Sequence, residues 1–183
     1  MGKDVLRSQI RERFRQFTEQ ELKHKSEKLS ACLFHYLGQI ASEKNLNRLG
    51  VFSPLSDEPV WHYSFNESFE YLQVHMQDEK NLSFHSISID EMRAMRGVLK
   101  LDVHQLSQAQ TPEILLVPGV AFTSNCERLG RGKGYYDRYL KGFSGIKVGV
   151  AFSFQVVEDV FPEGHDQALD VVITEKNIFK EIK

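Results

Sequence analysis

The segment from Arg128 to Leu140 combines glycines with cationic side chains. It reads RLGRGKGYYDRYL, with glycine at positions 130, 132 and 134 and Arg131 and Lys133 between them. Glycine at every second position removes side chains, so backbone N–H groups can approach a ligand closely. Arginine and lysine beside such N–H groups favour a polyanion. The pattern predicts a phosphate-binding loop.

Two familiar phosphate-binding motifs do not match this loop. A Walker loop has a glycine five residues before Gly132 and Ser or Thr after Lys133, whereas this chain has Glu127 and Gly134 there. The dinucleotide fingerprint needs a third glycine three residues after the second, and that position holds Tyr135. The loop therefore belongs to neither class.

Alternating helix and strand patterns surround the loop and must position it. Apolar residues at helical spacing predict a helix from about Val5 to Phe17, and a capping box of Thr18 and Glu21 opens a second helix that reaches about Ile40. Further patterns predict strands at 48–52, 71–75, 82–89, 114–117, 147–152 and 170–174, and a helix at 135–141. This alternation predicts one three-layer α/β/α domain over residues 1–183, with a mostly parallel central sheet and functional groups on loops at strand ends.

Length and composition limit the functional class. The 183 residues suffice for a substantial core, and a net charge of −2 gives no general attraction to nucleic acid or to an acidic membrane. The charged N-terminal segment does not resemble a secretory signal, and no segment is apolar over a membrane-spanning length. Cys32 and Cys126 are far apart, without metal-binding spacing. We expect a cytoplasmic monomer with free thiols that binds neither nucleic acid nor membrane.

Four segments, in the same order along the chain, resemble the 5-formyltetrahydrofolate cyclo-ligase family, whose members are also called methenyltetrahydrofolate synthetases. The segments are KDVLR, VFSPLSDE, LLVPGVAFTSNCERLGRGKGYYDRYL and HDQALDVVIT. Their shared order argues against chance similarity, and the third is the most specific. The resemblance implies an α/β fold and an enzyme that converts 5-formyltetrahydrofolate and ATP into 5,10-methenyltetrahydrofolate, ADP and phosphate with Mg²⁺.

The resemblance also assigns nucleotide-binding residues. It implies that ATP, as cosubstrate, contacts Lys3, Arg7, Arg128, Leu129, Gly130, Arg131, Gly132, Lys133, Gly134, Tyr135 and Tyr136. Among these, Arg128, Lys133 and Tyr136 are the expected catalytic residues. Lys3 and Arg7 are four residues apart, so they share one face of a helix and can both face phosphates.

Four more residues match the magnesium and folate positions of the family. The resemblance implies that Asp137 and Asp170 hold the ion. Ser53 and Glu58 match substrate positions, and a carboxylate can accept paired hydrogen bonds from the amino and ring N–H groups of a pterin.

The implied reaction explains this set of residues. A formamide oxygen is a poor leaving group, so the family transfers the γ-phosphoryl group of ATP to it, and phosphate leaves when N10 of the same folate attacks the carbon. Phosphoryl transfer needs hydrogen-bond donors and cations around the phosphate oxygens, together with Mg²⁺, and no covalent nucleophile.

Several of these residues have ordinary structural interpretations that the sequence leaves open. Lys3 and Arg7 could form a solvated helix face, Asp137 could favour the first turn of a helix, and Asp170 could be a turn residue at a strand end. His165 and Asp166 fit a structural hydrogen bond or the border of the site. The segment 61–63 could line a folate pocket or cap the core.

Two alternative functions also stay open. Thr123 stands where the family usually has Asp, and residues 97–102 lack the usual proline-containing stretch. These departures motivate a non-catalytic family member that binds nucleotide or folate, which would bind without turnover. A nucleic-acid or phosphoprotein module that uses the basic loop is the third hypothesis, and the near-neutral charge disfavours it.

Overall fold

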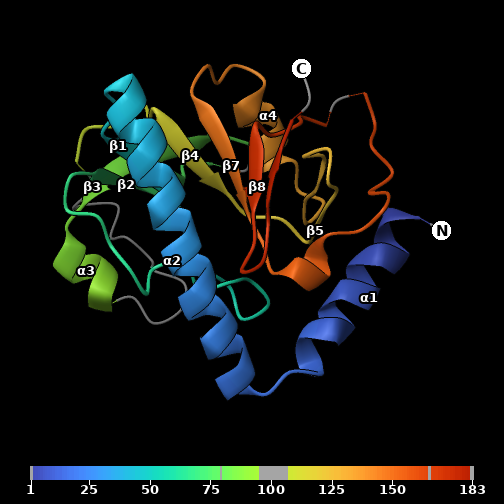
Figure 1. Ribbon diagram of the computed structural model, residues 1–183. Coiled ribbons are helices and arrows are strands. Elements are labelled where there is room, and N and C mark those ends of the chain that lie inside the picture. Colours follow the sequence, from blue (N-terminus) through green and yellow to red (C-terminus); the bar gives the residue numbers. More distant parts are fainter. Residues whose placement is uncertain (1, 79, 95–106, 165, 182–183) are drawn as a thin grey trace.

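A computed structural model describes residues 2–78, 80–94, 107–164 and 166–181 (Figure 1). Its helices are α1 (Lys3–Arg15), α2 (Glu19–Lys44), α3 (Ile89–Ala94) and α4 (Tyr135–Leu140), with a short 3-10 helix η2 (Ser153–Gln155). Its strands are β1 (Arg48–Val51), β2 (Glu70–Met76), β3 (Leu82–Ile87), β4 (Ile114–Val117), β5 (Ala121–Phe122), β6 (Arg128–Leu129), β7 (Ile146–Val150), β8 (Val171–Ile173) and β9 (Ile178–Lys180).

The strands form a large sheet and a small one. The large sheet has seven strands in the order β3-β2-β1-β4-β7-β8-β9. From β2 to β8 every neighbouring pair is parallel, and β3 and β9 pair antiparallel at the two edges. β5 and β6 form a separate antiparallel pair. The predicted mostly parallel sheet is therefore confirmed.

The two N-terminal helices form where the sequence predicts them. The Thr18 hydroxyl accepts a hydrogen bond from the Glu21 backbone N–H at 3.2 Å, and the Glu21 carboxylate accepts one from the Thr18 N–H at 2.8 Å. This reciprocal capping satisfies two N–H groups that the first turn of a helix leaves unpaired. α2 ends at Asn45, which adopts a left-handed conformation with φ of 53°.

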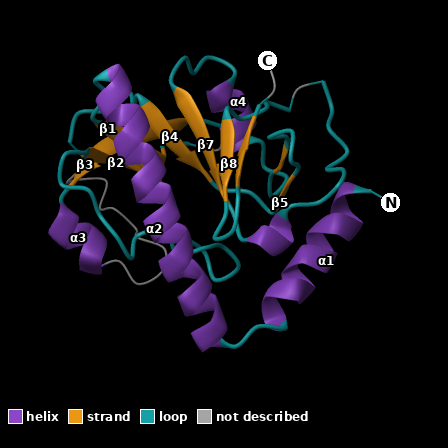
Figure 2. Cartoon of the chain, viewed as in Figure 1, coloured by secondary structure: helices purple, strands orange, loops and turns teal. Residues whose placement is uncertain are grey.

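Helices cover both faces of the large sheet, which gives the expected α/β/α layers (Figures 1 and 2). In β4, Ile114 and Leu116 pack into the core under α1 and α2, whereas Leu115 and Val117 pack into the core that includes Leu140 of α4. Successive side chains of a strand point to opposite faces, so a strand that is apolar throughout must be covered twice. Each fully buried side chain of this size stabilises the fold by about 1.5–3 kcal/mol.

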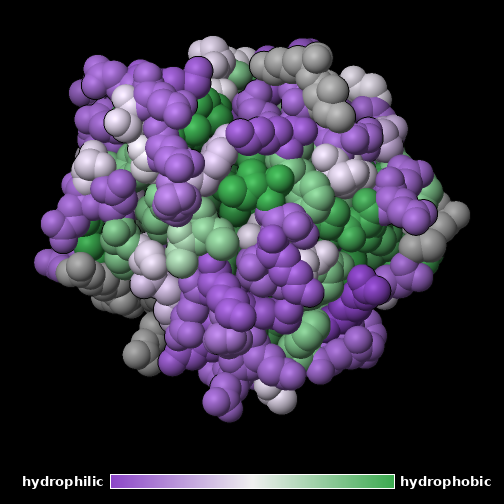
Figure 3. All heavy atoms as spheres, viewed as in Figure 1, coloured by the Kyte–Doolittle hydropathy of each residue, from purple (hydrophilic) through white to green (hydrophobic). Residues whose placement is uncertain are grey.

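Polar residues cover much of the molecular face shown in Figure 3, as expected when the helices bury the apolar faces of the sheet. On this face, apolar residues reach the surface in patches across the middle, and polar residues cover most of the rest. No helix among the described residues is long and apolar enough to cross a membrane.

The structure adds elements that the sequence did not predict. β5 and β6 have two residues each, too few for a periodic pattern, and β9 exposes Ile178 and Lys180 on an edge. Trp61 is fully buried and donates its indole N–H to the Phe52 carbonyl at 2.8 Å, which assigns this residue to the core. Residues 97–102 and His165 lie outside the described residues.

Candidate functional site

The glycine-rich loop lies at the carboxyl ends of the central parallel strands. Segment 52–58 follows β1, and Pro118 to Val120 follow β4, its parallel neighbour. The Val120 N–H donates to the Leu129 carbonyl at 2.8 Å, and Arg128 Nη1 donates to the Pro118 carbonyl at 3.1 Å. The start of the loop is thus fixed to the sheet edge where ligands of open α/β folds usually bind.

The loop backbone has the conformation that its glycines permit. Gly132 and Gly134 have φ angles of 96° and 68°, a left-handed region that other residues rarely adopt. Within the described parts of the chain, the backbone N–H groups of residues 131–134 meet no hydrogen-bond acceptor. The Lys133 side chain is exposed and forms no ion pair with any described residue. The backbone N–H groups of residues 131–134 and the Lys133 ammonium group are therefore available to a ligand at the same loop.

Arg128 lies buried beneath the loop, with 6% of its surface exposed. Its Nη2 donates to Asp137 Oδ1 at 2.5 Å, and its guanidinium lies over the Tyr136 ring at 5.8 Å. Its Nε has no hydrogen-bond partner in the part of the chain that the structure describes. A buried guanidinium needs a carboxylate nearby, and Asp137 supplies it.

Tyr136 presents a second unpaired donor. Its hydroxyl is buried without a hydrogen-bond partner. Burial raises the pKa of Tyr136 far above its usual value, and the nearby Glu58 carboxylate raises it further. The phenol therefore stays protonated and can donate a hydrogen bond. Tyr135 is half-buried, and its ring lies under the Arg138 guanidinium at 5.3 Å.

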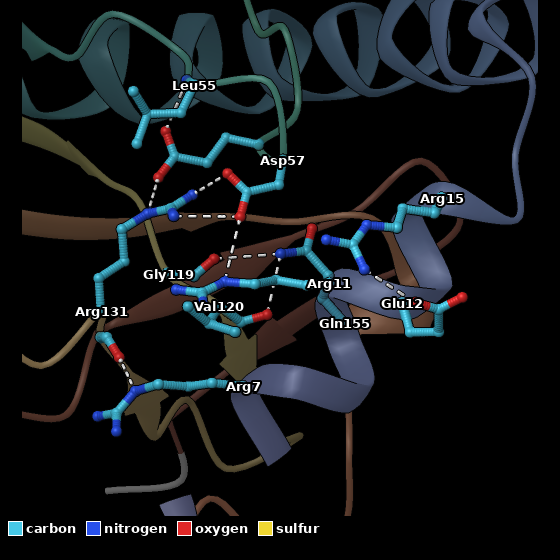
Figure 4. Close-up of polar contacts among 12 residues, drawn as sticks. Arg7, Arg11, Glu12, Arg15, Leu55, Asp57, Gly119, Val120, Arg131 and Gln155 are labelled. Carbon is cyan, nitrogen blue, oxygen red and sulfur yellow. Dashed lines mark hydrogen bonds and ion pairs between the residues drawn. The ribbon is translucent and has the colours of Figure 1, made fainter. Parts of the chain in front are cut away.

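Arg131 is held by two carboxylates from the segment after β1 (Figure 4). Its Nε donates to Glu58 Oε1 at 2.9 Å, and its Nη1 and Nη2 donate to Asp57 at 3.1 and 2.5 Å. Arg11 of α1 reaches the same Asp57 at 3.6 Å. The other oxygen of Glu58 accepts the Leu55 N–H at 3.0 Å. Arg131, which is expected to bind the nucleotide, and Glu58, which is expected to bind folate, thus form an ion pair.

The two carboxylates respond differently to the same guanidinium. Burial raises the pKa of Glu58, because only 5% of its side chain is exposed and Leu55 and Arg131 offset the desolvation only in part. Burial also acts to raise the pKa of Asp57, but the paired hydrogen bonds from Arg131 outweigh it and the pKa is lowered. Asp57 keeps 24% of its side chain exposed, so its desolvation is smaller.

The two N-terminal cations, Lys3 and Arg7, contact different parts of the structure. Arg7 donates its Nε to the Gly130 carbonyl at 2.9 Å, and its guanidinium lies against Gly132, where an added Cβ would be 3.7 Å from it. Lys3 instead pairs with Asp166 at 2.8 Å and Glu163 at 3.0 Å. Arg7 therefore joins the loop, while Lys3 connects α1 to the segment before β8.

The sequence comparisons identify the family. The model of the 5-formyltetrahydrofolate cyclo-ligase family matches residues 66–175. The chain belongs to this family. Its expected membership and enzyme class, a ligase, are therefore confirmed.

Individual relatives agree with this membership. The 5-formyltetrahydrofolate cyclo-ligase of Mycoplasma pneumoniae is 27% identical over 179 residues, which are 96% of this chain and 100% of the relative. A probable 5-formyltetrahydrofolate cyclo-ligase of Schizosaccharomyces pombe is 32% identical over 83 residues, but the match covers 38% of this chain and 41% of the relative. The solved 5,10-methenyltetrahydrofolate synthetase of Aquifex aeolicus superposes with a TM-score of 0.77 at 29% identity, covering 100% of this chain and 94% of that one.

The structure does not bring the two expected magnesium residues together. Asp137 contacts Arg128 beside Pro118, at the carboxyl end of β4. Asp170 precedes β8, and its Oδ2 accepts the Lys147 N–H at 2.8 Å near the start of β7. These are opposite ends of parallel strands, so the expectation that both residues hold one ion is corrected. Asp170 instead fixes the amino end of β8.

The structure also places Leu129 and Ser53, two further residues that are expected to contact a ligand. The Leu129 side chain is buried in the core, so only its backbone can face a ligand. Ser53 lies two residues beyond β1, and its Oγ accepts a hydrogen bond from Gln73 Nε2 at 3.1 Å. Ser53 thus stays at the sheet edge with the segment that carries Glu58.

Three residues of this site, Arg11, Asp57 and Gln73, were not predicted from the sequence. Arg11 follows Arg7 by one helical turn, and Asp57 adjoins Glu58, so spacing offered a signal for both. Gln73 is a polar residue between the apolar Leu72 and Val74 of β2, and sequence alone does not connect it with Ser53.

Proposed function

We propose that the chain catalyses the ATP-dependent cyclisation of 5-formyltetrahydrofolate to 5,10-methenyltetrahydrofolate, with release of ADP and phosphate. Family membership supports the reaction class. The observation that carries the proposal is the run of backbone N–H groups at residues 131–134 that have no acceptor among the described residues. Lys133 and Arg7 lie beside them, and Arg131 of the same loop forms an ion pair with Glu58. Phosphate-binding and pterin-binding groups of suitable chemistry are therefore neighbours.

The reaction proceeds in two stages. The formyl oxygen attacks the γ-phosphorus of ATP, an O–P bond forms, and the bond to ADP breaks. N10 then attacks the activated formyl carbon and loses its proton, and the C–O bond breaks as phosphate leaves with the former formyl oxygen. The second stage is intramolecular, so holding the folate in its reactive conformation removes most of the entropic cost.

The loop neutralises charge during the first stage. In this proposal Lys133 and the N–H groups of residues 131–134 contact the β- and γ-phosphate oxygens, and Arg7, which is bonded to the Gly130 carbonyl, adds a second cation. Arg128 Nε and the Tyr136 hydroxyl are buried donors without a hydrogen-bond partner among the described residues, so a developing oxyanion would satisfy them at no cost of reorganisation. We assign the catalytic role to Lys133, Arg128 and Tyr136.

Folate binding changes the partner of Arg131. Both oxygens of Glu58 are already engaged, one by Arg131 and one by Leu55. In the proposed complex the pterin takes the place of Arg131 on Oε1 and shares Oε2 with the Leu55 N–H, since each carboxylate oxygen can accept two hydrogen bonds. The released guanidinium remains tied to Asp57 and lies in the nucleotide loop, where it can turn to the phosphates.

Magnesium fits the site through Asp137. No group of three or more potential ligands occurs among the described residues, and Mg²⁺ bound with ATP needs only one or two carboxylates besides phosphates and water. Asp137 uses Oδ1 for Arg128, which leaves Oδ2 as the oxygen that would face the ion. The bound ion would supply charge neutralisation across the β- and γ-phosphates.

Turnover by the purified protein tests the proposal. The protein is mixed with 5-formyltetrahydrofolate, ATP and Mg²⁺, and methenyl absorbance is followed. We expect product that depends on both substrates, with one ADP formed per methenyl group. If both ligands bind and no product forms, the alternative of a non-catalytic binding protein replaces this one.

A further inference from the structure

Gln73 of β2 holds a buried side-chain carbonyl that accepts no hydrogen bond from any residue that the structure describes. Gln73 is 2% exposed, its Nε2 donates to Ser53 Oγ at 3.1 Å and to the Val74 carbonyl at 3.3 Å, and its Oε1 has no hydrogen-bond partner. A carbonyl can only accept, so the contact with Val74 fixes the NH₂ group on that side. The unpaired end is therefore an acceptor.

A buried amide elsewhere in the chain shows how unusual this is. Gln155 is fully buried, yet its Nε2 donates to the Gly119 and Val120 carbonyls and its Oε1 accepts the Phe152 N–H. Leaving a buried acceptor unpaired is costly, so such atoms call for a specific explanation. Within the described residues, the other two unpaired buried side-chain atoms are Arg128 Nε and Tyr136 Oη, both in the proposed catalytic set.

The position of Gln73 connects it with the folate side of the site. It pairs in register with Val51 near the carboxyl end of β1 and contacts Ser53 directly. The sheet face that carries apolar Tyr71 becomes polar from Gln73 onward, because His75 follows on β2 and His85 lies opposite Gln73 on β3. This end of the face is thus built for hydrogen bonding rather than for core packing.

We propose that Gln73 determines specificity for the folate by accepting a hydrogen bond at Oε1 from an N–H group of the reduced pterin. The inference rests on the proposed function. A reduced pterin carries an exocyclic amino group and several ring N–H groups, so it has donors for Gln73 besides those that pair with Glu58. Ser53 holds the Gln73 NH₂ group and thereby keeps the carbonyl in a defined orientation.

Replacing the amide by a side chain of similar size tests this role. Gln73→Met removes the acceptor, and we expect the KM and Kd for 5-formyltetrahydrofolate to rise about tenfold, the value of one ordinary hydrogen bond, with the KM for ATP unchanged. The unliganded protein should melt at a higher temperature than Gln155→Met, because Gln73→Met loses an unpaired buried acceptor together with the two Nε2 hydrogen bonds. Gln155→Met is the matched control, and we expect it to lower the melting temperature because it breaks satisfied hydrogen bonds.

A second variant covers the case in which Gln73→Met does not fold. Gln73→Glu, which burial keeps protonated, retains a carbonyl acceptor and an O–H donor toward Ser53 or Val74, so its folate KM should stay within about threefold of wild type. An unchanged folate KM in folded Gln73→Met, an equal rise of both KM values, or a Gln73→Glu protein with tenfold weaker folate binding would overturn the role of Gln73. Absence of turnover in the wild-type protein would instead overturn the proposed function.

Discussion

Glu58→Gln separates the folate contact from the nucleotide contact. The wild-type carboxylate accepts one hydrogen bond from Leu55 and one from Arg131, and we assign the pterin to the place of Arg131. A glutamine keeps the size and can still accept the Leu55 N–H. Its NH₂ group, however, meets the donors of Arg131 or of the pterin, so the substituted side chain cannot accept two pterin hydrogen bonds.

The expected loss follows from the charge and burial of Glu58. Hydrogen bonds to a charged group contribute about 1.5–3 kcal/mol, which corresponds to about a 10- to 150-fold rise of the Kd for 5-formyltetrahydrofolate. The Glu58 side chain is only 5% exposed, so solvent screening reduces this little. In the proposed complex ATP contacts the loop rather than Glu58, so its Kd should change less than about threefold.

Titration calorimetry with each ligand separately, and KM values for each substrate, measure the two effects. Wild-type folate affinity should fall as the pH is lowered through the raised pKa of Glu58, at a higher pH than for an ordinary glutamate, and Glu58→Gln should lack this fall. Equal weakening of folate and ATP, or an unchanged folate Kd, would refute the pterin contact.

The pH dependence of the unfolding free energy tests the raised pKa of Glu58 independently of ligand binding. Because the native pKa of Glu58 is raised, the native protein holds this proton more tightly than the unfolded chain. Glu58 therefore lowers the unfolding free energy as the pH rises from about 4.5 through the native pKa, and the Gln protein should lack this component. Urea unfolding across this pH window measures the difference.

Three further predictions concern the loop, the ion and the fold. Lys133→Ala should reduce kcat by about a hundredfold or more while the melting temperature matches that of Lys28→Ala, an exposed helix control, since the exposed Lys133 side chain forms no hydrogen bond or ion pair with any described residue; wild-type turnover would refute its role. Asp137→Asn should raise the Mg²⁺ concentration needed for half-maximal rate, and Asp170→Asn should not; the reverse result would restore Asp170 as the metal residue. Burial acts to raise the pKa of Glu175, but hydrogen bonds from Ser153 and Lys25 lower it, so Glu175→Gln should lose about 2 kcal/mol of unfolding free energy at pH 7. That loss should shrink as the pH falls below about 4.5, and a difference that is constant with pH in urea unfolding would contradict it.

The elements that sequence predicted well have a strong local cause. The capping box at Thr18 and the apolar runs of β4 and β8 depend on neighbouring residues, so their signal is present in a short window. The glycine-rich loop was predicted for the same reason, because alternating glycine and cations is a local pattern. β5 and β6 depend on each other across a turn and have no such signal.

The site was less predictable because its pairings join distant segments. Arg131 reaches Asp57 and Glu58 over more than seventy residues, and Lys3 reaches Asp166 across most of the chain. Residue type alone cannot choose among such partners. Asp170 illustrates this point, because a carboxylate before a strand suits a metal or a backbone N–H equally well, and the register of β7 and β8 places it on Lys147.

Transfer of the formyl oxygen tests the central claim most directly. 5-Formyltetrahydrofolate labelled with ¹⁸O in the formyl group is converted with ATP and Mg²⁺, and the released phosphate is analysed by mass spectrometry. Phosphoryl transfer to the formyl oxygen predicts one ¹⁸O atom in each phosphate for every methenyl group formed. Unlabelled phosphate, with the ¹⁸O recovered in water, would contradict the account of the glycine-rich loop as a phosphoryl-transfer site.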